Sequence, residues 1–311
     1  MRPNLRDISV SVKSGEVLCF VSSDIATNYD VLCCISGWAR CDGGCVLLDG
    51  KKIGWRHPLS PVTIGYSPRT EYHSHLLTTR QSLEFFCSLR GIVKVKREVD
   101  RIIKMFKLDS VADFSPNLMS DGTLARFRVA VAMVGEPDVV LLHQPFGSLD
   151  SSGKSIVFDA INWIKKRSKI VILTSNSIDE CAHLASRVAI IVCGQVVLVS
   201  SPQGIRTRFS DSYSLTARVA SCDKNQADIL VQSLRQRFPQ SEIFVDSLSY
   251  LHVLLPFRTD SLGEIFRLME SVKKHLQVSD FVLRHTTLDN VIEALERGTG
   301  APSKRPSVIS P

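Results

Sequence analysis

The sequence contains no apolar stretch long enough to cross a bilayer and no leader-like N-terminus. Its longest nearly apolar run, Val188 to Val199, is interrupted by Gly194 and Gln195. A transmembrane helix needs about 20 apolar residues, and a secretory signal needs a basic segment followed by an apolar core. We therefore expect that the polypeptide has no signal peptide and does not cross a membrane by itself.

A disulfide framework and a metal-binding motif are missing as well. The nine cysteines are spaced irregularly, and several stand within apolar runs, namely Cys19, Cys33, Cys34 and Cys193. This placement is typical of reduced core residues in a cytosolic protein. Cys41 and Cys45 form a close pair outside such runs. No second pair of ligands accompanies them, so we predict no metal site.

Clustered charge is also absent. The 311 residues are 44% hydrophobic, 22% charged and 7% aromatic, which is typical of a globular chain with room for one large domain and a smaller one. The formal net charge is +7, yet Lys and Arg are scattered through predicted helices rather than gathered in one stripe. The pattern therefore favours a solvated surface over nucleic-acid binding.

The apolar patterns predict an α/β domain over residues 1–210. Residues 17–21, 139–142 and 170–174 have the composition of buried strands, and a helix is expected over about 153–166 between the last two. A strand, a helix and a second strand imply a parallel sheet with helices on its faces. A helical subdomain is expected over about 74–135. Weaker patterns indicate strands over residues 5–12 and 62–66, a strand and turn over 45–51, and a helix over 28–36.

The pattern changes after residue 210 and predicts a smaller α+β domain over residues 211–297. Strands are expected over 213–219, 242–245, 251–255 and 281–284, and helices over 224–237 and 262–274. This β-α-β-β-α-β order is that of a ferredoxin-like domain. A terminal helix is expected over 288–297, and the polar, proline-containing tail over 298–311 is expected to be disordered.

The most informative segment follows the predicted strand at residues 139–142. It reads H-Q-P-F-G-S-L-D from His143 to Asp150, and it resembles the D-E-P-x-x-G-L-D string of ABC transporter nucleotide-binding domains. In such ATPases the Asp orders Mg²⁺ and the Glu positions the attacking water. His143 and Gln144 stand at those two places, whereas Asp150 is kept.

The resemblance extends to the place of the phosphate-binding loop. The family string G-P-N-G-A-G-K-T-T falls on residues 22–30, where Ala26 alone is kept. Asn28 replaces the Lys that reaches the phosphates, and Tyr29 replaces the hydroxyl residue that binds Mg²⁺. The resemblance thus implies vestigial nucleotide-site positions at Ser22, Asp24, Thr27, Asn28, Tyr29 and Asp30. Asp24 and Asp30 would bring negative charge towards a phosphate.

The remaining sequence motifs of the family occur in the same order in this chain. Arg69 stands in place of the Gln of the Y-x-P-Q loop, and Asn176 takes the place of the switch histidine. Ser120, Asp121 and Gly122 resemble part of the L-S-G-G-Q signature, with its Ser and second Gly kept. Gly153-Lys154-Ser155 imitates the end of a phosphate loop at the wrong spacing, and we interpret Lys154 as an exposed residue at a helix start.

Further strings are similar to those of ABC subfamily A. They include L-T-T-R-Q-S-L-E, S-L-R-G and T-T-L-D-N-V-I, and the likeness covers roughly residues 5–297. The resemblance implies an ABC ATPase-like parallel sheet core with a helical subdomain, followed by the ferredoxin-like regulatory domain of that subfamily. Full members of the subfamily are lipid exporters or floppases.

The functional hypothesis is a pseudo-ATPase: a structural or regulatory part of a lipid transporter that does not hydrolyse ATP. No cofactor is expected, and ATP and Mg²⁺ would bind weakly at most. Implied partners are a transmembrane half and a second nucleotide-binding domain, with lipid as an indirect substrate and location at the cytosolic face of a membrane. Two alternatives stay open: an ATP-hydrolysing transport subunit working with an intact partner domain, and a fragment of a full-length transporter.

Overall fold

The computed structural model describes residues 5–53, 62–68, 76–209, 212–219, 242–245, 250–256 and 278–285, with single positions between 232 and 292. The chain forms two compact units, residues 1–199 and 200–311. This division falls ahead of the boundary expected after residue 210, so helix α7 (Pro202–Phe209) belongs to the second unit. The tail over residues 298–311 lies outside the described residues.

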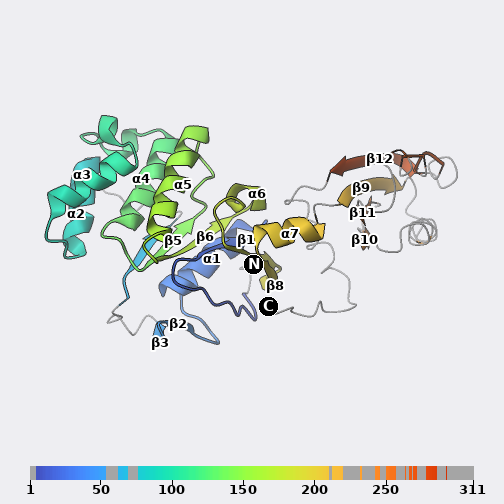
Figure 1. Ribbon diagram of the computed structural model, residues 1–311, viewed down its shortest axis with the longest axis horizontal. Coiled ribbons are helices and arrows are strands. Elements are labelled where there is room, and N and C mark those ends of the chain that lie inside the picture. Colours follow the sequence, from blue (N-terminus) through green and yellow to red (C-terminus); the bar gives the residue numbers. More distant parts are fainter. Residues whose placement is uncertain are drawn as a thin grey trace. The chain divides into compact units, whose positions relative to one another are not determined.

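A six-stranded sheet with the order β4-β5-β6-β1-β7-β8 forms the centre of the first unit (Figure 1). Adjacent strands from β4 to β7 pair in parallel. All five residues of β1 are buried, as expected for a strand covered on both faces. The predicted α/β class is confirmed. The strands are β1 (Val17–Val21), β4 (Ile64–Ser67), β5 (Val139–His143), β6 (Ile170–Ser175), β7 (Arg187–Val192) and β8 (Gln195–Ser200).

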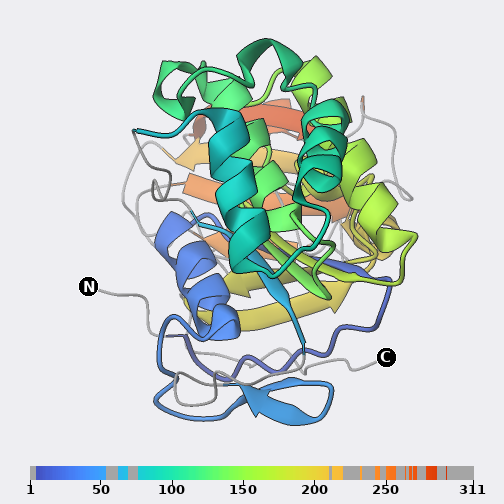
Figure 2. The ribbon, with the colours of Figure 1, turned by 90° about the vertical axis from the view of Figure 1, so that its left-hand side faces the viewer.

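Helices pack onto this sheet and extend beyond it. Figure 2 looks onto these helices, which lie in front of the strands of the first unit. α1 contacts β5 and β6, α4 contacts β4 and β5, and α5 contacts β6. α2 and α3 pack on each other and, with α4, form the expected helical subdomain. The helices are α1 (Ile25–Ser36), α2 (Thr79–Leu89), α3 (Val95–Met105), α4 (Asp121–Met133), α5 (Ser151–Lys165) and α6 (Ile178–Cys181).

Three local predictions were wrong. α1 begins at Ile25 rather than near Asn28, because Asp24 caps it. Residues 5–12 form no strand; their apolar side chains pack against the core without joining the sheet. Cys193 is exposed, not buried, because it turns the chain between β7 and β8 with a φ of 49°. The predicted segment at residues 45–51 is a hairpin of β2 (Val46–Leu48) and β3 (Lys51–Ile53).

The second unit contains a four-stranded antiparallel sheet with the order β10-β11-β9-β12. The first and second strands along the chain are separated in the sheet by the third, which is the arrangement of a split βαβ motif. This strand order is the one expected for the predicted ferredoxin-like domain. The predicted helices lie largely outside the described residues. The strands are β9 (Ser212–Val219), β10 (Glu242–Val245), β11 (Tyr250–Pro256) and β12 (Val278–His285).

The ring of Trp163 on α5 lies between two guanidinium groups. The Cζ atom of Arg101 on α3 is 4.5 Å from the ring centroid, and that of Arg167 is 3.5 Å from it. Glu136 lies within ion-pair distance of both arginines, at 3.9 and 3.2 Å. Cation–π contacts of this kind contribute about 0.5–2 kcal/mol each. The cluster therefore fastens α3 of the helical subdomain to α5.

None of the helices in the described part of the chain is both long and apolar enough to cross a membrane.

Replacing Gly65 by Ala is expected to destabilise the first unit by about 3 kcal/mol or more, the upper range for overpacking a core. A Cβ atom at this position would lie 1.9 Å from the backbone oxygen of Ala132, so β4 and α4 could not keep their separation. The midpoint of denaturant unfolding measures the loss. Gly43→Ala is the matched control, since a Cβ atom there meets nothing within 4 Å; equal midpoints for the two variants would contradict the packing argument.

Candidate functional site

A cluster of side-chain amides joins the carboxyl ends of three adjacent strands. The fully buried Asn28 amide donates from Nδ2 to the backbone oxygens of Ser22 and Ser175, at 3.0 and 3.1 Å. It also lies 3.0 Å from Oδ1 of Asn176, which accepts from Nε2 of Gln144 at 2.7 Å. Three predicted positions from distant parts of the chain therefore meet. We call Asn28, Gln144 and Asn176 the amide cluster.

The amide cluster is neutral and tightly placed. Asn28 projects from α1, Gln144 follows β5, and Asn176 follows β6. The backbone of Gln144 has a φ of 45°, and its N–H donates to the carbonyl oxygen of Thr174. Among the described residues, no donor reaches the buried Oδ1 atom of Asn28. The backbone oxygens at two strand ends thus accept hydrogen bonds from a neutral amide of the cluster.

Asp24 occupies the N-terminal end of α1. Its carboxylate accepts from the backbone N–H groups of Ala26 and Thr27, both at 3.1 Å, and from the Thr27 hydroxyl at 2.7 Å. These N–H groups and the helix dipole would otherwise attract an external anion. The hydroxyl hydrogen bond from Thr27, followed by the two backbone bonds, lowers the pKa of the Asp24 carboxyl. The chain therefore supplies its own anion at this helix end.

His143 lies beside Tyr29 instead of facing solvent. The two rings meet edge to face with centroids 5.8 Å apart, and Nδ1 of the buried His143 is 3.2 Å from the Thr174 hydroxyl. The Tyr29 pKa is raised, chiefly by a hydrogen bond with Cys33 and secondly by burial. These two aromatic residues fill the space between the first turns of α1 and the end of β5. Asp30 follows Tyr29 on α1 and is half-buried.

Lys154 is not the exposed residue that the sequence predicted. Its ammonium group pairs with Glu180 at 3.1 Å, and the same carboxylate accepts from the Ser175 hydroxyl at 3.0 Å. No local sequence pattern indicates this contact, because 26 residues separate the two partners. The pair adds a charged link beside the amide cluster.

The signature-like residues lie at the start of α4. The Ser120 hydroxyl accepts from the backbone N–H of Thr123 and caps the helix, while Asp121 is exposed. A Cβ atom on Gly122 would lie 3.1 Å from the backbone oxygen of Ser148, so glycine permits close approach to the segment after β5. Asp150 caps α5 by accepting from Gly153 N–H at 2.8 Å. Arg69 lies outside the described residues.

The capping role of Asp24 was missed from the sequence although its signal was present. Asp is among the preferred N-cap residues, and Asp24 stands directly before the apolar and polar pattern of the helix. The pairing of Glu180 with Lys154 had no such signal. Among the described residues, no group of three or more His, Cys, Asp or Glu side chains is placed to hold a metal ion.

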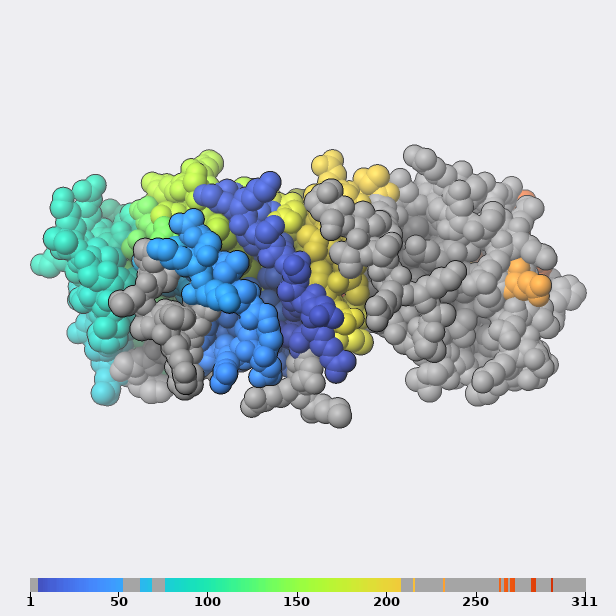
Figure 3. Space-filling model, turned by 90° about the horizontal axis from the view of Figure 1, so that it is seen from below, coloured from blue at the N-terminus to red at the C-terminus, as the bar shows by residue number. Residues whose placement is uncertain are grey.

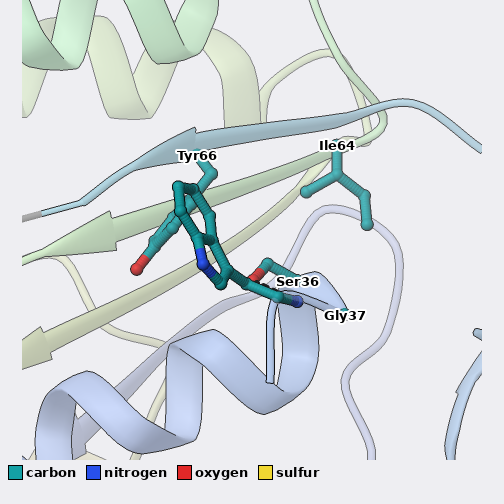
Figure 4. A pocket seen from close by; sticks show the side chains of 5 residues that line it. Ser36, Gly37, Ile64 and Tyr66 are labelled. Carbon is teal, nitrogen blue, oxygen red and sulfur yellow. Dashed lines mark hydrogen bonds between the residues drawn. The ribbon is translucent and has the colours of Figure 1, made fainter. Parts of the chain in front are cut away.

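An open hollow of about 520 Å³ lies at the opposite end of α1 from the amide cluster. It is lined by Ser36, Gly37, Trp38, Ile64 and Tyr66. Figure 4 shows Ile64 and Tyr66 reaching it from β4, and Ser36 and Gly37 from the end of α1. The rings of Trp38 and Tyr66 are 6.3 Å apart and nearly perpendicular. The hollow contains none of the predicted nucleotide-site residues.

The first unit has the fold of an ABC-type ATPase domain. A solved ATP-binding subunit of an ABC transporter superposes with a TM-score of 0.60 at 18% identity, covering 66% of this chain and 86% of that one. A dimeric ATP-binding cassette, MJ0796, solved with ADP and Pi, gives a TM-score of 0.57 at 20% identity, covering 64% and 90%. At these identities the likeness shows the fold alone.

Sequence relatives specify the subfamily. Human ATP-binding cassette sub-family A member 13 is 32% identical over 233 residues, which is 74% of this chain and 5% of that protein. The mouse glucosylceramide transporter ABCA12 is 26% identical over 290 residues, or 92% and 11%. The model of the ABCA1-like C-terminal R1 regulatory domain matches residues 210–284. The chain thus carries a nucleotide-binding domain of the ABC sub-family A type with its regulatory domain, and it spans a small part of its relatives' length.

Asn28→Ala is expected to lower the free energy of unfolding by about 2–4 kcal/mol. The substitution removes a donor from buried backbone oxygens and leaves a small cavity. Denaturant unfolding followed by circular dichroism measures the change. Asn162→Ala on the exposed side of α5 is the control and should stay within about 0.5 kcal/mol of the parent; a similarly small effect at Asn28 would refute the structural role of the amide cluster.

The stability contributed by the Asp24 charge is expected to depend on pH. Because its pKa is lowered in the folded state, this contribution is present above the unfolded pKa of about 3.9 and is lost as pH falls through the folded value. Asp24→Asn keeps a capping side chain without the charge. The stability difference between parent and variant should therefore shrink below pH ~4. Asp42→Asn in an exposed loop supplies the control; a pH-independent difference at Asp24 would contradict the assignment.

Proposed function

We propose that this chain is part of a sub-family A lipid transporter in which its own nucleotide-binding domain does not hydrolyse ATP. The amide cluster carries the proposal. Asn28 stands at the position of the phosphate-binding Lys, and its amide is committed to Ser22 and Ser175. A neutral amide held by backbone oxygens offers no cation to a phosphate group.

The helix end beside the cluster supports the same conclusion. A phosphate bound there would meet the Asp24 carboxylate, which already accepts the N–H groups of the first turn. Two like charges about 4 Å apart cost on the order of 4 kcal/mol at an effective dielectric of about 20, before exposure to solvent reduces the figure. A micromolar site is worth about 8 kcal/mol in total. The residues present therefore do not fit a Mg²⁺–nucleotide complex.

One observation favours a second candidate, which is participation in the ATP site of an intact partner. Ser120 still caps α4, and Gly122 still permits close approach to Ser148. This end of α4 keeps its geometry independently of the amide cluster. A nucleotide-binding domain paired with this chain would then hydrolyse ATP while this chain completes the pair.

The names of the relatives support a proposal for the partners, the location and the transported molecule. One of them is named a glucosylceramide transporter, another a phospholipid-transporting ATPase, and one similar structure is a dimeric cassette. We infer that the partners are a membrane-spanning half and a second nucleotide-binding domain. The chain would then lie at the cytosolic face of a membrane, and the transported molecule would be a lipid.

Calorimetric titration with ATP and Mg²⁺ tests the proposal directly. No heat of binding is expected at micromolar nucleotide, and no phosphate release at millimolar nucleotide, because Asn28 stands in place of the phosphate-binding Lys and His143 and Gln144 stand in place of the two catalytic acids. Turnover that disappears in Asn28→Ala or Gln144→Ala would overturn the proposal. Asn162→Ala controls for an unspecific effect of removing an amide.

A reciprocal variant separates the charge effect from the fold. Asp24→Gly combined with Asn28→Lys removes the competing anion and restores the cation, and it should strengthen nucleotide binding at least ~10-fold over the parent chain. Binding no stronger than in the parent, in a variant that retains the parent's circular dichroism, would show that these two residues do not exclude the nucleotide.

A further inference from the structure

The connection between α2 and α3 exposes apolar and basic side chains together. Phe85 and Leu89 lie four residues apart on one face of α2 and are 51% and 67% exposed, and Val93 in the connecting turn is 94% exposed. Lys94, Lys96 and Arg97 follow directly and are exposed. We call these six residues the α2–α3 patch. Figure 3 shows the surface of this part of the chain, in teal, facing solvent.

The cations of the patch are not used within the described part of the chain. The acidic residues nearby pair elsewhere: Glu98 with Arg101 at 2.5 Å and Asp100 with Arg80 at 2.8 Å. No ion pair of Lys94, Lys96 or Arg97 is found among the described residues. Positive charge near a helix N-terminus also opposes the helix dipole. Neither ion pairs nor stabilisation of α3 therefore explains why three cationic side chains stand at this place.

The apolar members project outward instead of lining a groove. A side chain that is 94% exposed, as Val93 is, has no neighbours on either side to form a binding cleft. Protruding apolar tips flanked by Lys and Arg are suited to a surface that is negatively charged outside and apolar underneath. A folded acidic protein offers the charge but no yielding apolar layer, so it fits the patch less well.

We propose that the α2–α3 patch binds an anionic phospholipid membrane. Lys94, Lys96 and Arg97 contact the lipid head groups, while Leu89 and Val93 insert at the boundary between head groups and acyl chains. Phe85 extends the apolar contact along α2. The inference does not depend on whether the chain binds nucleotide, because the patch shares no residue with the amide cluster.

Flotation of the full chain with lipid vesicles tests this proposal. Vesicles of phosphatidylcholine with 30% phosphatidylserine should carry the protein upward, vesicles of phosphatidylcholine alone should not, and added salt should release it. Replacing Lys94, Lys96 and Arg97 together by Gln should weaken binding about 100-fold, since each cation near an anionic surface contributes roughly fivefold. Leu89→Ser with Val93→Ser should weaken it further without changing the charge.

A charge-matched triple variant serves as the control. Lys51→Gln, Lys52→Gln and Lys166→Gln remove three exposed cations elsewhere and should leave vesicle binding within about twofold of the parent. Equal losses in the two triple variants would mean that net charge alone drives binding and would overturn the proposal. Binding to neutral vesicles as strong as to anionic ones would also overturn it. Unchanged circular dichroism in each variant assigns a loss of binding to the surface and not to unfolding.

Discussion

The hydrogen bonding of two buried strand ends constrains the whole candidate site. Ser22 follows β1 and Ser175 ends β6. Their buried backbone oxygens need donors, because a buried carbonyl group left unpaired costs about 1–3 kcal/mol. The Asn28 amide donates to both oxygens, and the Ser22 N–H donates to the Ser175 oxygen as well, at 3.4 Å. The Asn28 amide also donates to Oδ1 of Asn176, and the Gln144 amide donates to the same oxygen. These two hydrogen bonds hold Asn176 and Gln144 beside Asn28. Strand ends, α1 and the segment after β5 are thereby held as one assembly.

The sequence predicted the sheet far better than the contacts at its edge. β1, β5 and β6 are continuous apolar runs bounded by polar residues, so composition alone located them. Asn28 and Gln144 could be assigned by their spacing from those strands, but their connection through Asn176 could not, since Gln144 and Asn176 lie 32 positions apart. The start of α1 was misplaced because Asp24 was considered as a charge facing a ligand and not as a helix cap. The role of Asp24 as the N-cap of α1 depends on neighbouring residues alone, so the sequence was sufficient to predict it.

The core and the site follow different constraints. The residues of β1 are buried and pair with β6 and β7, whereas the members of the amide cluster stand in the first turn of a helix or just after a strand. Substitutions at such ends leave the packing of the sheet intact, so the fold does not depend on which side chains stand at its edge. This explains how the chain retains a TM-score of 0.60 to an ATP-binding subunit while its charged site residues differ from the family strings.

The two guanidinium groups around Trp163 also have an optical consequence. The Trp163 ring between Arg101 and Arg167 is partly buried, whereas Trp38 is 69% exposed. Separation of α3 from α5 would wet the Trp163 indole and move its fluorescence emission to longer wavelengths, while the emission of Trp38 would change little. The chain therefore contains a natural spectroscopic probe of movement between its helical subdomain and its sheet core.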